Sequence, residues 1–215
     1  MLNIIIKDIY QSRKLLLLYL LMLVGFIVAV HIFTGDLVGT GIFAMIFPLG
    51  LSIKNEIYEQ KNKGYSLIKS MPIKYYKIVV SKFIITAIFA LFGLIISICT
   101  ISILTKSIYL DSKIFAFSIG SVTAGMIFVG IFYAIAYKFG AEKANAFIVV
   151  FFAFTVVLAQ VAFLFHKNVY LSNTILAIER FFKNTNGYIL LIYALLTYLL
   201  IMLLSIKVFK NSKVV

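Results

Sequence analysis

The stretch Phe83-Ile-Ile-Thr-Ala-Ile-Phe-Ala-Leu-Phe-Gly-Leu-Ile-Ile-Ser-Ile-Cys-Thr-Ile-Ser-Ile-Leu-Thr105 decides the fold class, because it is long, apolar and free of Asp, Glu, Lys and Arg. A helix of about 20 mostly apolar residues crosses a bilayer core about 30 Å thick. Five further stretches meet this condition: Leu15–Phe33, Leu37–Ile53, Ile114–Tyr137, Ala144–Phe165 and Tyr188–Ile206. We therefore predict an all-α, polytopic membrane protein in which residues 1–215 form one domain with six transmembrane helices.

The composition agrees with a membrane protein and excludes several kinds of site. Hydrophobic residues make up 63% of the chain and charged residues 13%, against about 45–50% and about 25% in soluble domains. The single cysteine, Cys99, rules out an intrachain disulfide. Two distant histidines, His31 and His166, are too few for a zinc site, so we predict no metal. No G-x-x-x-x-G-K-[ST] motif occurs, so ATP is not expected to bind this chain through a P-loop.

The basic residues indicate the orientation of the chain in the membrane. The chain has 20 basic and 7 acidic residues, a formal charge of +13. Fifteen of the basic residues fall on the side that holds both termini and residues 54–82. Because cytoplasmic loops carry the excess of Lys and Arg, both termini are predicted to be cytoplasmic, in a bacterial plasma membrane. The lysines are spread over four segments, which favours anionic lipid headgroups as a partner and disfavours nucleic acid.

Residues 1–13, ahead of the first span, have apolar residues at helical spacing with polar residues between them. The apolar positions are Leu2, Ile5, Ile6 and Ile9, and the polar ones are Asn3, Lys7 and Gln11. We predict a basic amphipathic helix that lies in the membrane interface. The alternative is a plain extension of the first span.

Residues 54–82 form the longest predicted cytoplasmic segment. Glu59 and Lys63 are spaced i,i+4 in the order that favours a helical ion pair, and Gly64 suits a helix end. A short second helix is expected to end before Pro72, because proline restricts the residue that precedes it. Its apolar side chains are those of Tyr65, Leu67, Ile68 and Met71. Such side chains in a cytoplasmic segment need a partner or the lipid interface, although a plain connecting loop remains an equal alternative.

Residues 166–187 form an outer segment that is too short to span the membrane. A re-entrant or interfacial helix fits it, and an ordinary outer-loop helix is the alternative. Its candidate residues are Ile175, Ile178, Glu179, Arg180 and Phe182.

Inside the spans, a few residues stand out. Asn145 and Gln160 are the strongest hydrogen-bonding side chains of the fifth span, and they face either a translocation path or another helix. Pro48 predicts a kink or break in the second span. No predicted span has a charged residue in its interior, so the energy for transport is expected to come from elsewhere.

The segment 54–82 is also where a family resemblance is strongest. Six spans with a basic amphipathic N-terminus resemble the type-2 exporter permeases of the ATP-binding-cassette (ABC) transporters. The motif is similar as well: Glu56 and Glu59 precede Gly64, Leu67-Ile68 follows, and Ser70-Met71-Pro72-Ile73 leads to Ile78-Val79-Val80-Ser81-Lys82. The Ser-Met-Pro form and small size resemble peptide exporters and antimicrobial-peptide immunity systems, including exporters of phenol-soluble modulins.

The resemblance implies roles for these residues. Glu56 and Glu59 would lie on a cytoplasmic extension of the second span. Gly64–Ser70 would form a coupling helix seated in a groove of a separate ATPase subunit, which binds ATP and Mg. Pro72 would end that helix, Lys82 would mark the start of the third span, and residues 173–182 would form the outer re-entrant helix.

The implied function is a permease subunit, not an enzyme. It would export amphipathic peptides together with a second permease, identical or related. Two other classes remain as alternatives. A polytopic membrane enzyme needs acids, histidines or a nucleophile near the membrane face, and Glu56 with Glu59 has no histidine close in sequence. The other alternative is a non-transporting membrane sensor.

Overall fold

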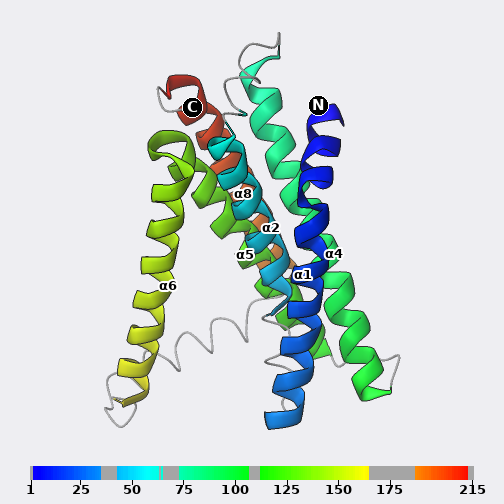
Figure 1. Ribbon diagram of the computed structural model, residues 1–215. Helices are drawn as coiled ribbons and strands as arrows, with labels where there is room; N and C mark the ends of the chain where they lie inside the picture. Colours follow the sequence, from blue (N-terminus) through cyan, green and yellow to red (C-terminus); the bar gives the residue numbers. More distant parts are fainter. Residues whose placement is uncertain are drawn as a thin grey trace.

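The computed structural model describes residues 2–34, 43–62, 64, 73–106, 112–164 and 187–212. In these ranges every regular element is a helix, as predicted (Figure 1). The α-helices are α1 (Leu2–Thr34), α2 (Ile46–Lys61), α4 (Tyr75–Thr105), α5 (Ser112–Phe139), α6 (Ala141–Leu164) and α8 (Gly187–Asn211).

Four helical stretches in the described ranges are long and apolar enough to cross a membrane. They are Leu2–Phe33, Tyr75–Thr105, Ile114–Phe139 and Ile192–Asn211. Their positions agree with the first, third, fourth and sixth predicted spans. The described part of α2 has 16 residues, and α6 covers most of the predicted fifth span. The count of six therefore stays a prediction.

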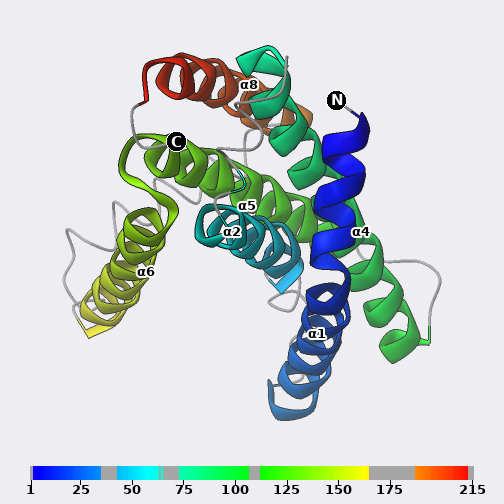
Figure 2. The same cartoon turned by 45° about the horizontal axis from the view of Figure 1, so that its top comes forward.

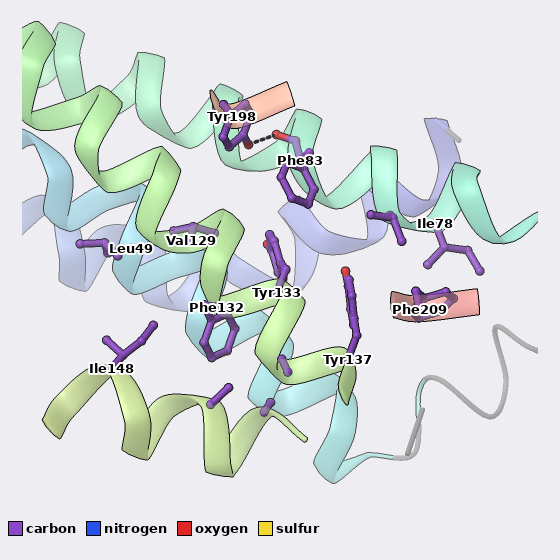
Figure 3. Close-up of a cluster of buried hydrophobic side chains, with 14 of the residues drawn as sticks. Leu49, Ile78, Phe83, Val129, Phe132, Tyr133, Tyr137, Ile148, Tyr198 and Phe209 are labelled. Atoms are coloured by element: carbon purple, nitrogen blue, oxygen red, sulfur yellow. Dashed lines mark hydrogen bonds between the residues drawn. The ribbon is translucent and has the colours of Figure 1, made fainter. Parts of the chain in front are cut away.

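Helices α2, α4 and α5 form the centre of the bundle. Helix α2 packs against α1, α4, α5 and α6, and α4 packs against α1, α2, α5 and α8 (Figure 2). Aromatic side chains fill the space between α4, α5 and α8 (Figure 3). The rings of Tyr133 and Tyr137 stack at 5.9 Å, and Phe209 meets Tyr137 edge-on at 4.9 Å. Close aromatic pairs of this kind add to the stability given by apolar burial.

The beginning of α1 is continuous with the first span. Helix α1 runs unbroken through residues 2–34, which fits the alternative interpretation of an extension of that span, and the interfacial position stays a prediction. The buried face consists of Ile4, Asp8 and Ser12, whereas Ile6 and Ile9 are exposed. The face toward the bundle thus combines apolar Ile4 with polar Asp8 and Ser12, and part of the predicted apolar face is exposed.

Pro48 lies near the start of α2. Helix α2 begins at Ile46 after a short 3₁₀ turn, which places Pro48 in the first helical turn. The first N–H groups of a helix have no intrahelical acceptor, so proline costs little there. The part of the predicted second span before residue 43 lies outside the described residues, so the predicted kink or break of that span stays a prediction.

One end of the bundle collects the lysine-rich segments. The starts of α1, α4 and α6 and the ends of α2, α5 and α8 all lie at the upper end in Figure 1. The start of α1, the end of α8 and the ends of the helices that flank residues 62–74 are found there. We call this the lysine-rich end. It groups the segments that the sequence assigned to one side of the membrane.

Candidate functional site

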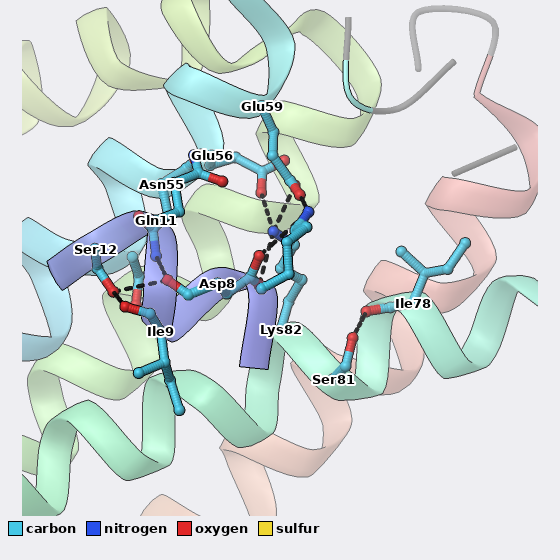
Figure 4. Close-up of polar contacts among 12 residues, drawn as sticks. Asp8, Ile9, Gln11, Ser12, Asn55, Glu56, Glu59, Ile78, Ser81 and Lys82 are labelled. Carbon is cyan, nitrogen blue, oxygen red and sulfur yellow. Dashed lines mark hydrogen bonds and ion pairs between the residues drawn. The ribbon is translucent and has the colours of Figure 1, made fainter. Parts of the chain in front are cut away.

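A buried cluster of charged side chains joins α1, α2 and α4 near the lysine-rich end (Figure 4). The ammonium nitrogen of Lys82 lies 3.0 Å from Asp8 Oδ2, 2.5 Å from Glu59 Oε2 and 3.8 Å from Glu56 Oε2. These four side chains are at most 2% exposed. Lys7, whose side chain is 42% exposed, pairs with both Glu59 and Asp8. We refer to these five residues as the ion cluster.

Each helix supplies its part of the ion cluster through simple periodicity. Glu56 and Glu59 are three residues apart on α2, so they lie on one face. Asp8 lies one turn from Ser12 on the inward face of α1, where the Ser12 hydroxyl donates to the Asp8 carbonyl at 2.7 Å. Lys82 lies two turns inside α4.

Two amide side chains fix α1 against α2 beside the ion cluster. Asn55 Nδ2 donates to the Asp8 carbonyl at 3.2 Å, and Gln11 Nε2 donates to the Asn55 carbonyl at 3.3 Å. Both bonds use backbone oxygens, so they depend on the register of the two helices.

The charges of the ion cluster nearly balance. Three carboxylates face two ammonium groups, which leaves a formal charge of −1 if all five are ionised. Taking a charge out of water is costly, and a buried pair is retained only when its partners stay in place. The ion cluster therefore resists any motion that separates α2 from α1 or α4.

A hydroxyl network extends from the ion cluster toward α5. The Thr86 hydroxyl donates to the Lys82 carbonyl at 3.0 Å and lies 3.0 Å from Ser52 Oγ and 3.2 Å from Tyr133 Oη. It accepts from both of these hydroxyls if its own proton is directed to the carbonyl. Helices α2, α4 and α5 are thus joined one turn below the charges.

The end of α2 also contacts the start of α6. Gln60 Oε1 accepts a hydrogen bond from the Ala141 N–H at 2.5 Å, and this N–H is one of the groups that a helix start leaves without an intrahelical acceptor. An exposed ion pair, Lys61 with Glu142 at 3.6 Å, lies beside it. Gly140, with φ 97°, makes the sharp turn between α5 and α6 that brings Ala141 there.

Asn145 lines a groove between α1, α2 and α6. The groove has a volume of about 290 Å³. Its lining consists of Tyr19, Ile46, Leu49, Gly50, Ile53, Lys54 and Asn145. The Tyr19 ring packs directly on Gly50, where a side chain would leave no room for it. The residues that line the groove are apolar except for Asn145, Lys54 and the phenol of Tyr19.

The structure places some of the predicted site residues and leaves others outside the described ranges. Glu56 and Glu59 lie on α2, and Gly64 lies just beyond it, where an added Cβ would come within 3.2 Å of the Glu59 carbonyl. The backbone of Gln160 belongs to α6. The predicted residues outside the described ranges are Lys63, Tyr65, Leu67, Ile68, Ser70, Met71, Pro72, Ile175, Ile178, Glu179, Arg180 and Phe182.

One sequence interpretation needs correction and another stays a prediction. Glu59 pairs with Lys82 and Lys7, and its predicted pairing with Lys63 lies outside the described residues because Lys63 does. Lys82 was expected only to mark the start of the third span, yet it is buried among three carboxylates. The sequence held one signal for this, the scarcity of acidic residues. The chain has seven of them, and three belong to the ion cluster. In the described ranges, no group of three His, Cys, Asp or Glu side chains is placed to hold a metal ion.

These features define a helical membrane protein whose lysine-rich end holds a buried ion cluster beside residues 62–74. A family model described as ABC-2 family transporter protein matches residues 3–210. The chain therefore belongs to the ABC-2 transporter family, as its resemblance to type-2 permeases predicted. Comparison with curated proteins gave no match. Membership in this family makes the chain a membrane permease of an ABC transporter, a transport subunit that works with an ABC ATPase.

Proposed function

We propose that this permease exports amphipathic peptides and that the ion cluster transmits the movement of the ATPase to the membrane helices. The observation that carries the proposal is the anchoring of the end of α2. Glu59 lies five residues before Gly64, where the predicted coupling helix begins, and it is held by Lys82 of α4 and Lys7 of α1. Any displacement of residues 64–70 is therefore applied to three helices together.

A second contact extends this connection to α6. Because Gln60 holds the first N–H of α6, movement of α2 also shifts the helix that carries Asn145. Packed helices change between discrete arrangements and do not deform continuously. Closure of two ATPase subunits on ATP and Mg would thus be converted into a change of the groove between α1, α2 and α6.

The groove is our candidate for part of the translocation path. Its apolar wall suits the apolar face of an amphipathic peptide, and Asn145 and Lys54 offer polar contacts. The 21 phenylalanines of the chain are compatible with such a substrate. We propose that a second permease, identical or related, completes the path, and that residues 166–187 form its outer re-entrant part.

The orientation follows from the same proposal. The lysine-rich end would face the bacterial cytoplasm, so that both termini and residues 64–70 are accessible to the ATPase. Single cysteines at Asn3 and Asn211, in a chain with Cys99 replaced by Ser, should react with a membrane-impermeant maleimide only in inside-out vesicles. Labelling of either site from the outside would contradict this orientation.

The coupling proposal is tested in proteoliposomes that hold the permease and its ATPase. Uptake of a fluorescent amphipathic peptide into inside-out vesicles and ATP hydrolysis are measured together. Replacing residues 64–70 by a Gly-Ser linker of equal length should abolish uptake while basal hydrolysis continues. The same swap at residues 106–112, which have no proposed role, is the matched control, because it should leave the stimulation of hydrolysis by the peptide intact.

Three results would overturn the proposal. Unchanged uptake after the swap at 64–70 would remove the coupling role of that segment. Hydrolysis without flux of any amphipathic peptide in the unaltered complex would favour a sensor. Turnover of a substrate by the purified chain without ATPase would favour a membrane enzyme.

A further inference from the structure

The outward face of α1 near the lysine-rich end carries a groove that the transport proposal does not use. Its lining consists of Ile6, Ile9, Tyr10, Arg13 and Leu16, and its volume is about 290 Å³. Tyr10 is 73% exposed and Arg13 is also exposed. All five residues belong to one face of a single helix; Leu16 is partly buried against the core, and the other four are exposed.

The surroundings of this groove indicate contact with lipid. Helix α1 is a candidate membrane span from Leu2 onward, and only 11% of its most apolar window is buried within the bundle. The exposed apolar face continues from Ile6 through Leu17 to Leu21. In water this face would be unfavourable, because burying apolar surface is worth about 25 cal/mol per Å². Acyl chains would cover it.

Arg13 is the exception on this apolar face. In the described ranges no carboxylate forms an ion pair with it. The nearest acidic residue in sequence, Asp8, faces inward and is bound by Lys7 and Lys82. Helical side chains point back toward the N-terminus, which directs the guanidinium over the turn that carries Tyr10 and Ile9. A guanidinium at an apolar surface needs an anion, and its planar donors match a phosphate.

We propose that this groove binds an anionic phospholipid. The phosphate accepts hydrogen bonds from the Arg13 guanidinium and the Tyr10 hydroxyl, while acyl methylenes cover Ile9 and Leu16. Lys14, exposed next to Arg13, adds a second positive charge near the headgroup. The site goes beyond the proposed function, because it depends on how α1 faces the membrane and not on the transported substrate.

A second copy of the chain fits the groove less well. Four acidic residues lie in the described ranges, and three of them, Asp8, Glu56 and Glu59, are buried in the ion cluster. The fourth, Glu142, is at the start of α6 and pairs with Lys61. A symmetric contact through this face would also bring two copies of Arg13 together, which is repulsive. The charge of the groove therefore favours a lipid.

The test uses the absence of tryptophan from the chain. A single reporter, Leu17→Trp, is placed next to the groove, and Leu199→Trp on the exposed face of α8 is the matched control. The full chain is reconstituted in phosphatidylcholine vesicles that contain either brominated phosphatidylglycerol or brominated phosphatidylcholine. Bromine quenches tryptophan on contact, so the ratio of the two quenching levels gives the preference for the anionic lipid at each reporter.

We expect the preference to be higher at the Leu17→Trp reporter than at the control. Arg13→Gln should lower it about fivefold, the equivalent of about 1 kcal/mol per basic residue at an anionic surface. Arg13→Lys should retain part of it, and Lys210→Gln on α8 should leave it unchanged. A preference at Leu17→Trp that survives Arg13→Gln would overturn the proposal. The proposal would also be overturned if neither lipid quenched the Leu17→Trp reporter and two Ile9→Cys chains formed a disulfide, because a second copy of the chain would then cover the groove.

Discussion

Replacing Lys82 by methionine should destabilise the chain more than any other single lysine substitution in the described ranges. The change removes the ammonium that lies within 3.8 Å of three carboxylates. Asp8, Glu56 and Glu59 would remain buried with Lys7 as their counterion, and the formal charge of the ion cluster would change from −1 to −2. The methionine fills a similar volume, so the loss reports the charge and not a cavity.

The magnitude follows from the burial of the carboxylates. Removing one partner of a buried ion pair costs about 3–5 kcal/mol, because the remaining charge stays uncompensated. For a chain of about 150–250 residues, 1 kcal/mol changes the Tm by about 2–4 °C. The expected fall in Tm is therefore about 6–20 °C.

The assay is thermal unfolding of the chain in detergent, followed by circular dichroism of the helices. Lys210→Met, an exposed lysine of α8, is the matched control and should shift the unfolding free energy by no more than about 0.5 kcal/mol. Combining Lys82→Met with Asp8→Asn and Glu59→Gln should restore at least half of the loss, because Glu56 and Lys7 then balance. A Tm for Lys82→Met within about 2 °C of the Tm of the unaltered chain would refute the reasoning.

Three further predictions concern packing and single hydrogen bonds. Gly93→Ala should destabilise the chain by about 1–3 kcal/mol, because the added Cβ would lie 2.7 Å from a backbone oxygen of the 3₁₀ turn. Gly120→Ala, whose Cβ meets nothing within 4 Å, should not destabilise it, and equal melting curves for the two variants would contradict this. Tyr198→Phe removes a buried 2.9 Å bond to the Phe83 carbonyl and should cost about 0.5–1.5 kcal/mol, and an unchanged Tm would be inconsistent with that bond. Gln60→Leu should speed amide hydrogen exchange at the start of α6, because it removes the acceptor of the Ala141 N–H. Unaltered exchange there would mean that this contact does not couple α2 to α6.

The class of protein was determined by properties that need no tertiary contact. A run such as Phe83–Thr105 is long enough and apolar enough to cross a bilayer whatever its neighbours are. The distribution of lysines is likewise a property of the chain, and the helices do bring the starts of α1 and α4 to the same end as the end of α8. Membership in the ABC-2 transporter family agrees with both.

The ion cluster was decided by the tertiary structure. Lys7 and Glu59 are 52 positions apart, and Glu59 and Lys82 are 23 apart, so no local spacing relates them. Helical periodicity assigned a polar and an apolar face to residues 1–13 but did not say which faces inward. In water the apolar face of a helix turns toward the core, but in a bilayer lipid can cover it. The inward position of Asp8 therefore follows from the carboxylates and ammonium groups of the other helices, which only the folded bundle brings together.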